Sequence, residues 1–423
     1  MRVATCTIAC LALAALHAGA SEAPGSPAEA PISAPTGFDD ASNGLVDEET
    51  HAADREAFDE AETAEDGLGP VYNAQACREC HQSPISGAVS QTTELRVGGL
   101  DRFGGFVDPV IPIGDGSAVI RGRSLVNDRA ICPSGEFPDR GAHSHVPREA
   151  TLRTLRASLN TLGDGFVEAI ANGALLRLAD EQCRRSRGEI CGQAVLVPVL
   201  EAGGRLRVGR FGWKGQHASL LSFSADAYLN EMGITSALLP EEVTPVCDAV
   251  DDPEDEAGPD GLADIDRFAR FMRATKAPPR DGALAQRPDA VAGAALFERI
   301  GCATCHVPTH VTAAAGTVIN AGALRVPEAL GNRRIHPYSD FLLHDVGTGD
   351  GIVQNGGSQT ARKLRTPPLW GVRTRTRLMH DAASLDFAAA IARHRGEASR
   401  ASRAFRELGP AQRRALVAFL GSL

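Results

Sequence analysis

The chain is poor in aromatic and methionine side chains and has no excess of positive charge. Phe, Trp and Tyr make up 5% of its 423 residues, and Met occurs 4 times. The 43 Lys and Arg are outnumbered by 53 Asp and Glu, so we expect no broad basic surface for nucleic acid or anionic lipid. With 43% apolar and 23% charged residues, the chain has an ordinary globular composition and is long enough for two domains.

Long apolar runs are also missing beyond the first twenty residues. No later segment holds about eighteen consecutive apolar residues, the length of a membrane-spanning helix, so we expect no membrane span in the mature chain. Residues 1–20 begin Met-Arg, continue with an apolar stretch and end Ala18-Gly19-Ala20, which is typical of a signal peptide cleaved near Ala20. Lipid attachment at Cys10 is the alternative. The sequence therefore predicts an exported, periplasmic protein.

Composition divides the remaining chain into an N-terminal extension and two larger parts. Residues 21–60 begin with a Pro-, Ala- and Ser-rich stretch that has little to bury, and we expect them to form a flexible extension. The acidic, Ala-rich stretch 47–66 is most simply a solvated helix. A Pro-containing break at 276–282 separates two helical patterns, so we place a domain boundary there, between 61–279 and 280–423.

Local patterns differ between these two parts. Residues 90–145 contain many Gly and Pro and short β-branched runs, which favour loops and short strands. Apolar residues recur at helical spacing in 264–275 and in 291–300, and a last helix is expected after Gly409-Pro410. The predicted fold class is mainly α, with two helical units, of which the first is enlarged by loop and short-strand insertions.

Two strings of the form Cys-Xaa-Xaa-Cys-His carry the clearest chemical signal. Each offers two thiols for thioether bonds to haem vinyl groups and an adjacent imidazole for the iron. A thioredoxin-like redox pair would favour a βαβ setting, and a four-cysteine zinc site would not need His twice. The sequence therefore predicts two covalently bound haem c groups, one held by Cys77, Cys80 and His81 and the other by Cys302, Cys305 and His306.

The four remaining cysteines beyond the leader form an even set. Cys132, Cys183, Cys191 and Cys247 can pair as disulfides in an oxidising compartment. The short loop between Cys183 and Cys191 favours that pair. Four small buried thiols are the alternative.

The scarcity of methionine limits the choice of a sixth iron ligand. Beyond the leader there are only three methionines, whereas nine histidines lie there outside the two strings. The sixth position decides whether a haem only passes electrons or also binds a small molecule. For any one of these histidines, a surface or hydrogen-bonded role is the ordinary expectation.

Further motifs resemble a family of bacterial di-haem oxidoreductases, often labelled thiol oxidoreductases, which is related to the di-haem cytochrome c peroxidases and MauG-type enzymes. The resemblance covers about residues 60–423. It implies a cytochrome c-like helical fold for each domain and a peroxide-linked or related haem oxidation. The motifs that carry it stand in the family's order: Gly67–Asn73, Phe211–Lys214, Asn230–Thr235, Phe341–Gly347, Arg365–Gly371 and His380-Asp381.

The resemblance also suggests two catalytic residues. In the related peroxidases a Trp lies between the haems and an acidic residue serves the peroxide site, and Trp213 and Glu231 resemble these two. A glutamate beside an open iron would take a proton from peroxide and return it to the leaving oxygen. Core packing of Trp213 and a surface position of Glu231 are the alternatives. The Gln that related peroxidases carry nearby is replaced here by Phe223 and Ser224.

For the C-terminal haem the resemblance implies a distal ligand about fourteen residues after His380, which is His394. We therefore expect ligation by His306 and His394, and a lower potential than that of a His/Met haem. Met379 is the rival ligand. The sequence departs from the family pattern at Ala382 and Arg395, where glycine is usual, so both positions can require unusual backbone angles.

For the N-terminal haem the sixth position is either open or reversibly occupied by His143 or His145 from a loop, although plain loop histidines are the more ordinary interpretation. Related peroxidases also bind calcium. The acidic run 251–260 lacks the EF-hand spacing, so it is most simply a solvated loop, with calcium as the alternative.

Three functions follow from these expectations. The first is an exported di-haem enzyme that reduces peroxide at the N-terminal haem with electrons from the C-terminal haem, supplied by a periplasmic donor. The second is a non-catalytic electron carrier or redox sensor. The third is oxidation of a protein partner, as MauG-type enzymes perform.

Overall fold

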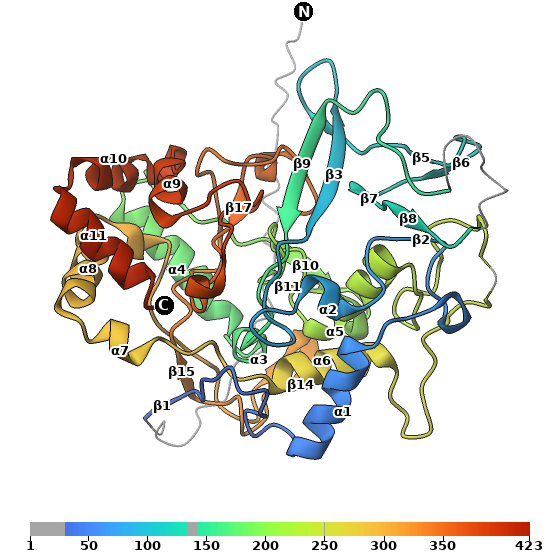
Figure 1. Ribbon diagram of the computed structural model, residues 1–423, viewed down its shortest axis with the longest axis horizontal. Coiled ribbons are helices and arrows are strands. Elements are labelled where there is room, and N and C mark those ends of the chain that lie inside the picture. Colours follow the sequence, from blue (N-terminus) through green and yellow to red (C-terminus); the bar gives the residue numbers. More distant parts are fainter. Residues whose placement is uncertain (1–29, 133–141, 249) are drawn as a thin grey trace, which may run out of the picture. The chain divides into compact units, whose positions relative to one another are not determined.

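The computed structural model describes residues 30–132, 142–248 and 250–423, and the predicted signal peptide lies outside this part of the chain. Residues 31–423 form one unit (Figure 1). Its α-helices are α1 (Glu48–Asp59), α2 (Cys77–Cys80), α3 (Asp164–Glu168), α4 (Asn172–Arg185), α5 (Leu220–Ala227), α6 (Asp264–Ala274), α7 (Gly282–Ala285), α8 (Pro288–Arg299), α9 (Phe387–Ala392), α10 (Ser399–Glu407) and α11 (Pro410–Leu420).

The strands are short and numerous. They are β1 (Ile32–Ser33), β2 (Val71–Tyr72), β3 (Thr93–Leu100), β4 (Phe106–Val107), β5 (Ile111–Ile113), β6 (Ala118–Ile120), β7 (Leu125–Val126), β8 (Arg129–Ala130), β9 (Leu152–Ala157), β10 (Leu196–Val199), β11 (Arg205–Val208), β12 (His310–Val311), β13 (Val318–Ile319), β14 (Leu324–Arg325), β15 (Arg333–Ile335), β16 (Leu343–His344) and β17 (Leu364–Arg365). Most of them belong to two-stranded sheets.

The longest strand pairing joins β3 and β9, which lie side by side in Figure 1. The two strands run antiparallel from the pair Thr93–Ala157 to the pair Gly98–Leu152, and β4 and β7 also pair with β3. The predicted short strands and loops of 90–145 are thus confirmed for the described residues of that range. The β3–β9 pair places the end of β9 close to the C-terminal part of the chain, because the Ala157 amide donates to the His380 carbonyl at 2.7 Å.

The expectation of a flexible extension is wrong for the described residues of 21–60. Strand β1 pairs in parallel with β15, whose other edge pairs with β12. The Ala34 amide then donates to the Arg334 carbonyl at 2.9 Å. The backbone of this segment is therefore bound to the body, which its poor supply of large apolar side chains did not indicate.

Helix α1 forms within the acidic stretch as expected, but it is not fully solvated. Its N-cap Asp47 accepts a hydrogen bond from the Thr50 amide at 2.8 Å. On the inner face, the buried Asp54 accepts two hydrogen bonds from Arg270 of α6, at 2.6 and 2.7 Å. Phe58 is also buried in the core there. The helix is held by the ion pair of Asp54 with Arg270 and by Phe58. Its sequence therefore lacks the periodic apolar residues that would indicate a buried face.

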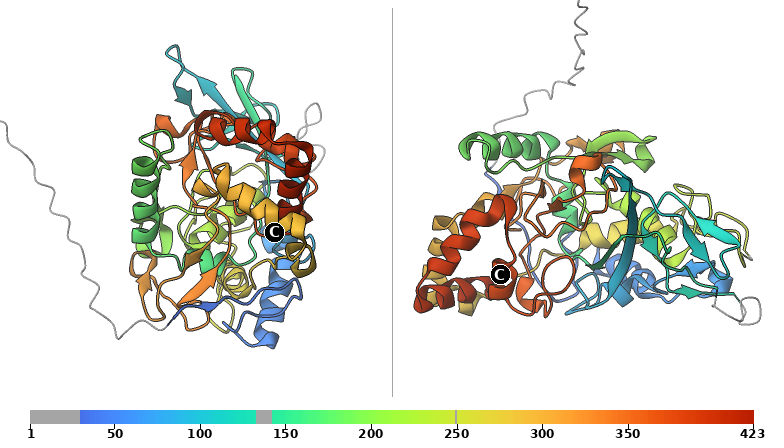
Figure 2. Two further views of the ribbon diagram at one scale, coloured as in Figure 1. Left: turned by 90° about the vertical axis from the view of Figure 1, so that its left-hand side faces the viewer. Right: turned by 90° about the horizontal axis from the view of Figure 1, so that it is seen from above.

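The described residues contain two main hydrophobic cores that bear on the site. The larger draws on α3, α5 and α6 and reaches from Ala34 to Trp370 along the chain. The smaller draws only on the C-terminal part, from α8 to the end of α11. Figure 2 shows α8 and α11 packed together with α10 beside them. The larger core includes residues on both sides of the boundary between 279 and 280, so this boundary stays a prediction.

Helices α8 and α11 approach each other very closely at Gly293. A Cβ atom at this position would lie 2.0 Å from the Ala415 carbonyl oxygen, so only glycine permits the contact. Proline at the first position of each helix, Pro288 and Pro410, suits the helix start because proline has no amide hydrogen to satisfy. This helix pair forms the frame behind the second Cys-Xaa-Xaa-Cys-His string.

The predicted helices 264–275, 291–300 and the last helix are confirmed by α6, α8 and α11, with α8 beginning three residues earlier than expected at Pro288. The mainly α fold class is correct only in part, because small sheets occur throughout the chain and not only as insertions in its first half. Among the described residues, no helix is long and apolar enough to cross a membrane.

Candidate functional site

The first Cys-Xaa-Xaa-Cys-His string forms the single-turn helix α2, which ends at His81. The Nδ1 atom of His81 lies 3.2 Å from the Ala88 carbonyl oxygen. A carbonyl oxygen only accepts hydrogen bonds, so Nδ1 carries the proton and Nε2 keeps its lone pair for a metal. Burial lowers the pKa of His81, which keeps the ring neutral. The Cys77 and Cys80 thiols have raised pKa values, also through burial, and are therefore protonated without a bound group.

The second string has the same local design. It begins after Gly301, whose φ of 94° ends α8 in the left-handed conformation, and it continues as a 3-10 turn over Cys302–Thr304. His306 donates from Nδ1 to the Tyr338 carbonyl oxygen at 3.1 Å. Burial lowers the pKa of His306 to about 4, so the ring is neutral and Nε2 is again the nitrogen available to a metal.

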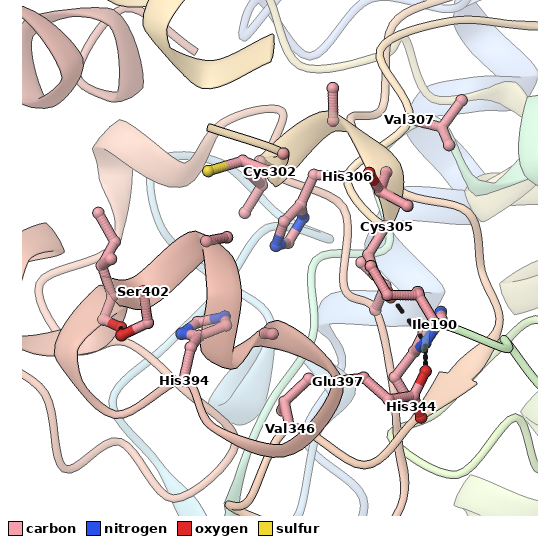
Figure 3. Close-up of a pocket in the computed structure, with 18 of the residues that line it drawn as sticks. Ile190, Cys302, Cys305, His306, Val307, His344, Val346, His394, Glu397 and Ser402 are labelled. Carbon is pink, nitrogen blue, oxygen red and sulfur yellow. Dashed lines mark hydrogen bonds and ion pairs between the residues drawn. The ribbon is translucent and has the colours of Figure 1, made fainter. Parts of the chain in front are cut away.

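His394 lies across a cavity from His306. It follows helix α9, which Asp386 caps, and its Nδ1 donates to the Ala390 carbonyl at 2.9 Å. Figure 3 shows the His306 and His394 rings turned toward the same space, with Cys302 at its edge. The cavity has a volume of about 940 Å³, and Cys302, Cys305, His306 and His394 all line it.

These residues fit a c-type haem. The cavity lies within the range of about 300–1,000 Å³ that cofactor pockets occupy. Two thiols stand at one edge, and the two imidazoles on opposite sides each keep one nitrogen free of the backbone. The same carbonyl contacts that fix the ring orientation also raise ligand basicity, which is the usual arrangement around metal-bound histidine.

Met379, the rival ligand, lines the same cavity together with His380. Its φ of 69° and the φ of 55° at Ala382 show that this turn uses left-handed backbone, as we expected at Ala382. Arg395 has a φ of −136°, so the unusual backbone angle that we expected there is absent. The next residue, Gly396, instead has a positive φ of 50°. The turn brings Met379 to the cavity but does not by itself distinguish it from His394 as a ligand.

Trp213 is buried between the surroundings of the two strings. Its indole Nε1 donates to the Ala157 carbonyl at 2.8 Å, at the end of β9. Its ring meets His380 edge to face at 6.0 Å between centroids, and it lines the cavity of the second string. The Leu159 backbone, two residues beyond Ala157, forms a hydrogen bond that raises the pKa of His81 against the larger effect of burial.

Glu231 lies on the side of the first string, in a short π-helix over Tyr228–Met232. Its Oε2 accepts a hydrogen bond from Asn73 at 2.9 Å, and its Oε1 lies 3.7 Å from Arg96. Burial and the neighbouring Glu94 carboxylate raise the pKa of Glu231 well above its usual range. Glu94 is itself held ionised by Arg96, which donates to it at 2.7 and 2.8 Å. Of the two carboxyl groups, Glu94 therefore carries the negative charge more readily and Glu231 binds a proton more readily.

His143 and His145 lie with their rings 4.5 Å apart. The intervening Ser144 donates from its amide to the Asn127 carbonyl at 3.0 Å, and the Asn127 side chain donates to the Asn230 carbonyl at 2.9 Å. The loop is therefore linked to the Glu231 segment. Ligation of the first haem by either histidine stays a prediction.

The acidic run 251–260 is divided in the structure. Oxygen atoms of Asp252 and Glu254 lie together with those of Glu242, within 4.8 Å of one another. Burial raises the pKa of Glu242 to about 8. Asp260 instead pairs with Arg267 at 2.9 Å. Calcium at this acidic cluster stays a prediction.

All four remaining cysteines form disulfides. The predicted Cys183–Cys191 pair is confirmed, and Cys132 pairs with Cys247. The alternative of four buried thiols is thus excluded. Disulfides persist in oxidising compartments, which suggests an extracytoplasmic location.

Several residues of the site carried no expectation from the sequence. Glu94 and Arg96 alternate on one strand, β3, so an unusual charged pair on one face was the available signal. Asp340, His344 and Glu397 form a buried cluster beside Cys305. His344 lies in the motif Phe341–Gly347, which carries the family resemblance, although the resemblance implied no role for it.

The geometry defines a class of protein in which two Cys-Xaa-Xaa-Cys-His strings each present a neutral imidazole, in different surroundings. Comparison with known families agrees. The profile of the family described as "Di-haem oxidoreductase, putative peroxidase" matches residues 139–423, and the chain belongs to this family. The second string lies inside the matched residues, and the first lies before them.

No curated protein matches the chain significantly. Among solved structures, the chain is similar to hydrazine synthase of Kuenenia stuttgartiensis, in a structure pressurised with xenon, with 13% identity over 97% of this chain and 99% of that chain. The TM-score of 0.35 does not establish a shared fold.

Proposed function

We propose that the protein is an exported di-haem c-type oxidoreductase that reduces peroxide at the haem of His81 with electrons delivered through the haem of His306 and His394. The observation that carries the proposal is the asymmetry of the two imidazoles. His306 faces a second imidazole across its cavity. The groups that act on His81 are the Ala88 and Leu159 backbone and Arg375. We infer from this difference that the C-terminal haem has two imidazole ligands and that the N-terminal haem leaves one iron position for a small molecule.

Haem c, when bound, supplies an iron that changes oxidation state and, where one position is open, accepts a small oxygen-containing ligand. The overall reaction consumes hydrogen peroxide, two protons and two electrons and gives two water molecules. The protein must therefore deliver two protons and two electrons to one place.

Glu231 is suited to handle the proton. The pKa of its carboxyl group is raised because burial and the neighbouring Glu94 carboxylate disfavour a second negative charge, which favours the protonated form. Asn73 donates to Oε2 and fixes the orientation of the group, so the acid form of Glu231 can donate its proton to the leaving peroxide oxygen and then take up another proton. Arg96 keeps Glu94 ionised, which maintains this division of charge.

Trp213 is suited to the passage of electrons between the two sites. It lines the cavity of His306 and is hydrogen-bonded to the end of β9, close to the backbone that contacts His81. Its packing against His380 and its buried indole hold the ring in one orientation. We place the protein in the periplasm, where a periplasmic donor would supply the electrons, because of the predicted leader and the two disulfides.

Spectroscopy of the purified full-length protein tests the proposal. Mass measurement should find two haems per mature chain. Ferric EPR should show one low-spin bis-histidine haem and one haem that becomes high-spin or binds cyanide after one-electron reduction, together with consumption of added peroxide. Two haems that both stay six-coordinate, with no peroxide reaction, would favour the electron carrier or redox sensor. A persistent oxidised state and a modified side chain on a co-purified protein would favour oxidation of a protein partner.

A further inference from the structure

A buried histidine that the proposed reaction does not use lies beside the second haem site. His344 is almost completely buried, and its ring lies between two carboxylates: Nε2 is 2.9 Å from Asp340 and Nδ1 is 2.8 Å from Glu397. The Cys305 sulfur is 3.9 Å from the ring. Figure 3 shows His344 joined to both Glu397 and Cys305. We call Asp340, His344 and Glu397 the His344 cluster.

The ring of His344 is a cation. Both of its nitrogens face carboxylate oxygens, which accept hydrogen bonds, so both nitrogens must donate. Burial alone would lower the pKa of His344, but the charge of Asp340 and the hydrogen bonds raise it well above its usual range. A buried cation between two anions is a strong, directional contact that is costly to break from one side.

The cluster joins the two chain segments that carry the iron ligands. On one side, His344 touches Cys305, which directly precedes His306. On the other side, Glu397 lies three residues after His394 and also accepts from the Asp345 amide at 3.0 Å. The backbone of the His394 segment is bound to the same strand end, because the Arg395 amide donates to the Val346 carbonyl at 2.8 Å.

The Cys183–Cys191 disulfide loop supports the cluster from both ends. The Cys191 amide donates to Glu397 at 3.0 Å. Gln182, next to Cys183, donates to Asp340 at 2.6 Å and to the Thr304 carbonyl at 2.7 Å. One donor is Cys191 itself, and the other, Gln182, is next to Cys183. Closure of the loop therefore places one hydrogen-bond donor at each carboxylate of the cluster.

We propose that His344 and Glu397 are positioning residues for the C-terminal haem, which hold His394 at the distance required for ligation, and that the Cys183–Cys191 loop keeps them in place. The inference rests on the proposed ligand pair of His306 and His394 and does not depend on the peroxide reaction. It gives the disulfide a role at the haem and not only in the stability of the chain.

The central test compares Glu397→Ala with Glu397→Gln in the full-length holoprotein. Alanine removes the acceptor of three donors, namely His344 and the Cys191 and Asp345 amides. Glutamine keeps one oxygen, which can serve the donors on one side of the carboxylate but not those on both sides. We expect Glu397→Ala to weaken ligation by His394 about 10–100-fold, the usual effect of removing a partner outside the ligand shell. The measurements are the low-spin EPR signal of the C-terminal haem and its titration with imidazole. Glu397→Gln should have a smaller effect than Glu397→Ala because it keeps one acceptor oxygen, and Glu407→Ala, at the exposed end of α10, should stay close to wild type.

The two disulfides provide a second, matched test. We expect Cys183→Ser with Cys191→Ser to shift the same signal in the same direction, by a smaller factor. Cys132→Ser with Cys247→Ser removes the other disulfide, whose Cys132 lies beside the Val246 carbonyl and away from the cluster, and should leave the C-terminal haem unchanged. The N-terminal haem of each variant serves as an internal reference.

The outcomes separate the two proposals. If wild type lacks the bis-histidine signal, the proposed ligand pair fails, whatever the variants do. If wild type shows it and both Glu397→Ala and the Cys183/Cys191 variant keep wild-type spin state and imidazole affinity, only the positioning role is overturned. Should Glu397→Ala fail to fold, the paired disulfide variants decide alone, because equal effects of the two pairs would contradict the inference.

Discussion

The histidines of the two Cys-Xaa-Xaa-Cys-His strings have the same kind of backbone partner, but the side chains around the two strings differ. In both, the histidine donates from Nδ1 to a backbone carbonyl, at 3.2 Å for His81 and 3.1 Å for His306, and burial keeps the ring neutral. Beyond that, His306 faces the imidazole of His394, whereas the surroundings of the first string contain the carboxyl group of Glu231.

This difference teaches that the attachment motif fixes the cofactor but not its chemistry. A second imidazole suits an iron that only exchanges electrons, and a protonated carboxyl suits a place where bonds to oxygen break. The residues that decide between the two come from elements distant in sequence, β3 and the π-helix in one case and the end of α9 in the other.

The largest expected effect is the selective loss of one haem. Replacing Cys302 and Cys305 by Ala should reduce the haem content from two per chain to one and remove the bis-histidine EPR signal, because the thioether bonds are lost. Replacing Cys77 and Cys80 should also remove one haem but keep that signal. Mass measurement and EPR on both variants check this. Identical spectra for the two would contradict the comparison of the sites.

Glu231→Gln should slow the reaction with peroxide by about 10²–10⁴-fold, because the amide cannot pass a proton between the oxygens. The EPR signal of the C-terminal haem should not change. Stopped-flow absorption after addition of peroxide measures the rate. Glu241→Gln, at an exposed position nearby, is the control. A rate equal to that of wild type would remove Glu231 from the mechanism.

Gly293→Ala should destabilise the C-terminal core by about 1–3 kcal/mol, the usual cost of overpacking. The added Cβ would lie 2.0 Å from the Ala415 carbonyl, so α8 and α11 must separate. Gly282→Ala, where nothing lies within 4 Å, should cost much less. Urea unfolding of both variants gives the free energies. The spectrum of the N-terminal haem should not distinguish them.

The smallest effect concerns the pH dependence of stability on the side of the first string. Burial raises the pKa of Glu62 to about 7, and Tyr228 donates to its carboxyl at 3.0 Å. The folded state then binds a proton that the unfolded state has released above pH 4.5, so the free energy of unfolding falls as pH rises from 4.5 to 7, by up to about 1.4 kcal/mol per unit. Glu62→Gln should flatten this slope in urea titrations at several pH values. An unchanged slope would show that Glu62 is not the group responsible.

Part of this molecule was predictable from its sequence because the chemistry requires neighbouring residues. The spacing within each string is local, and so are the helices α6, α8 and α11, whose apolar periodicity or proline start is visible in the sequence. The pair Cys183–Cys191 is close in sequence and was predicted for the same reason.

The rest depends on contacts between distant segments. The pKa of Glu231 is raised by Glu94 only because β3 contacts the π-helix. In the sequence, each glutamate alone looks like a surface carboxylate. His344 likewise becomes a buried cation only between Asp340 and Glu397. The N-terminal segment was misjudged because backbone pairing with β15, rather than side-chain burial, holds it.

That pairing has a consequence for how the chain is assembled. Ile32 and Ser33 pair with Arg333 and Arg334. This seam between β1 and β15 therefore cannot form until a strand about 300 residues later in the chain has been synthesised. Because local pairs form sooner than distant ones, the attachment turn at Cys77 can fold while this seam is still open. By the same argument, the seam should be among the last pairings of the described residues to form.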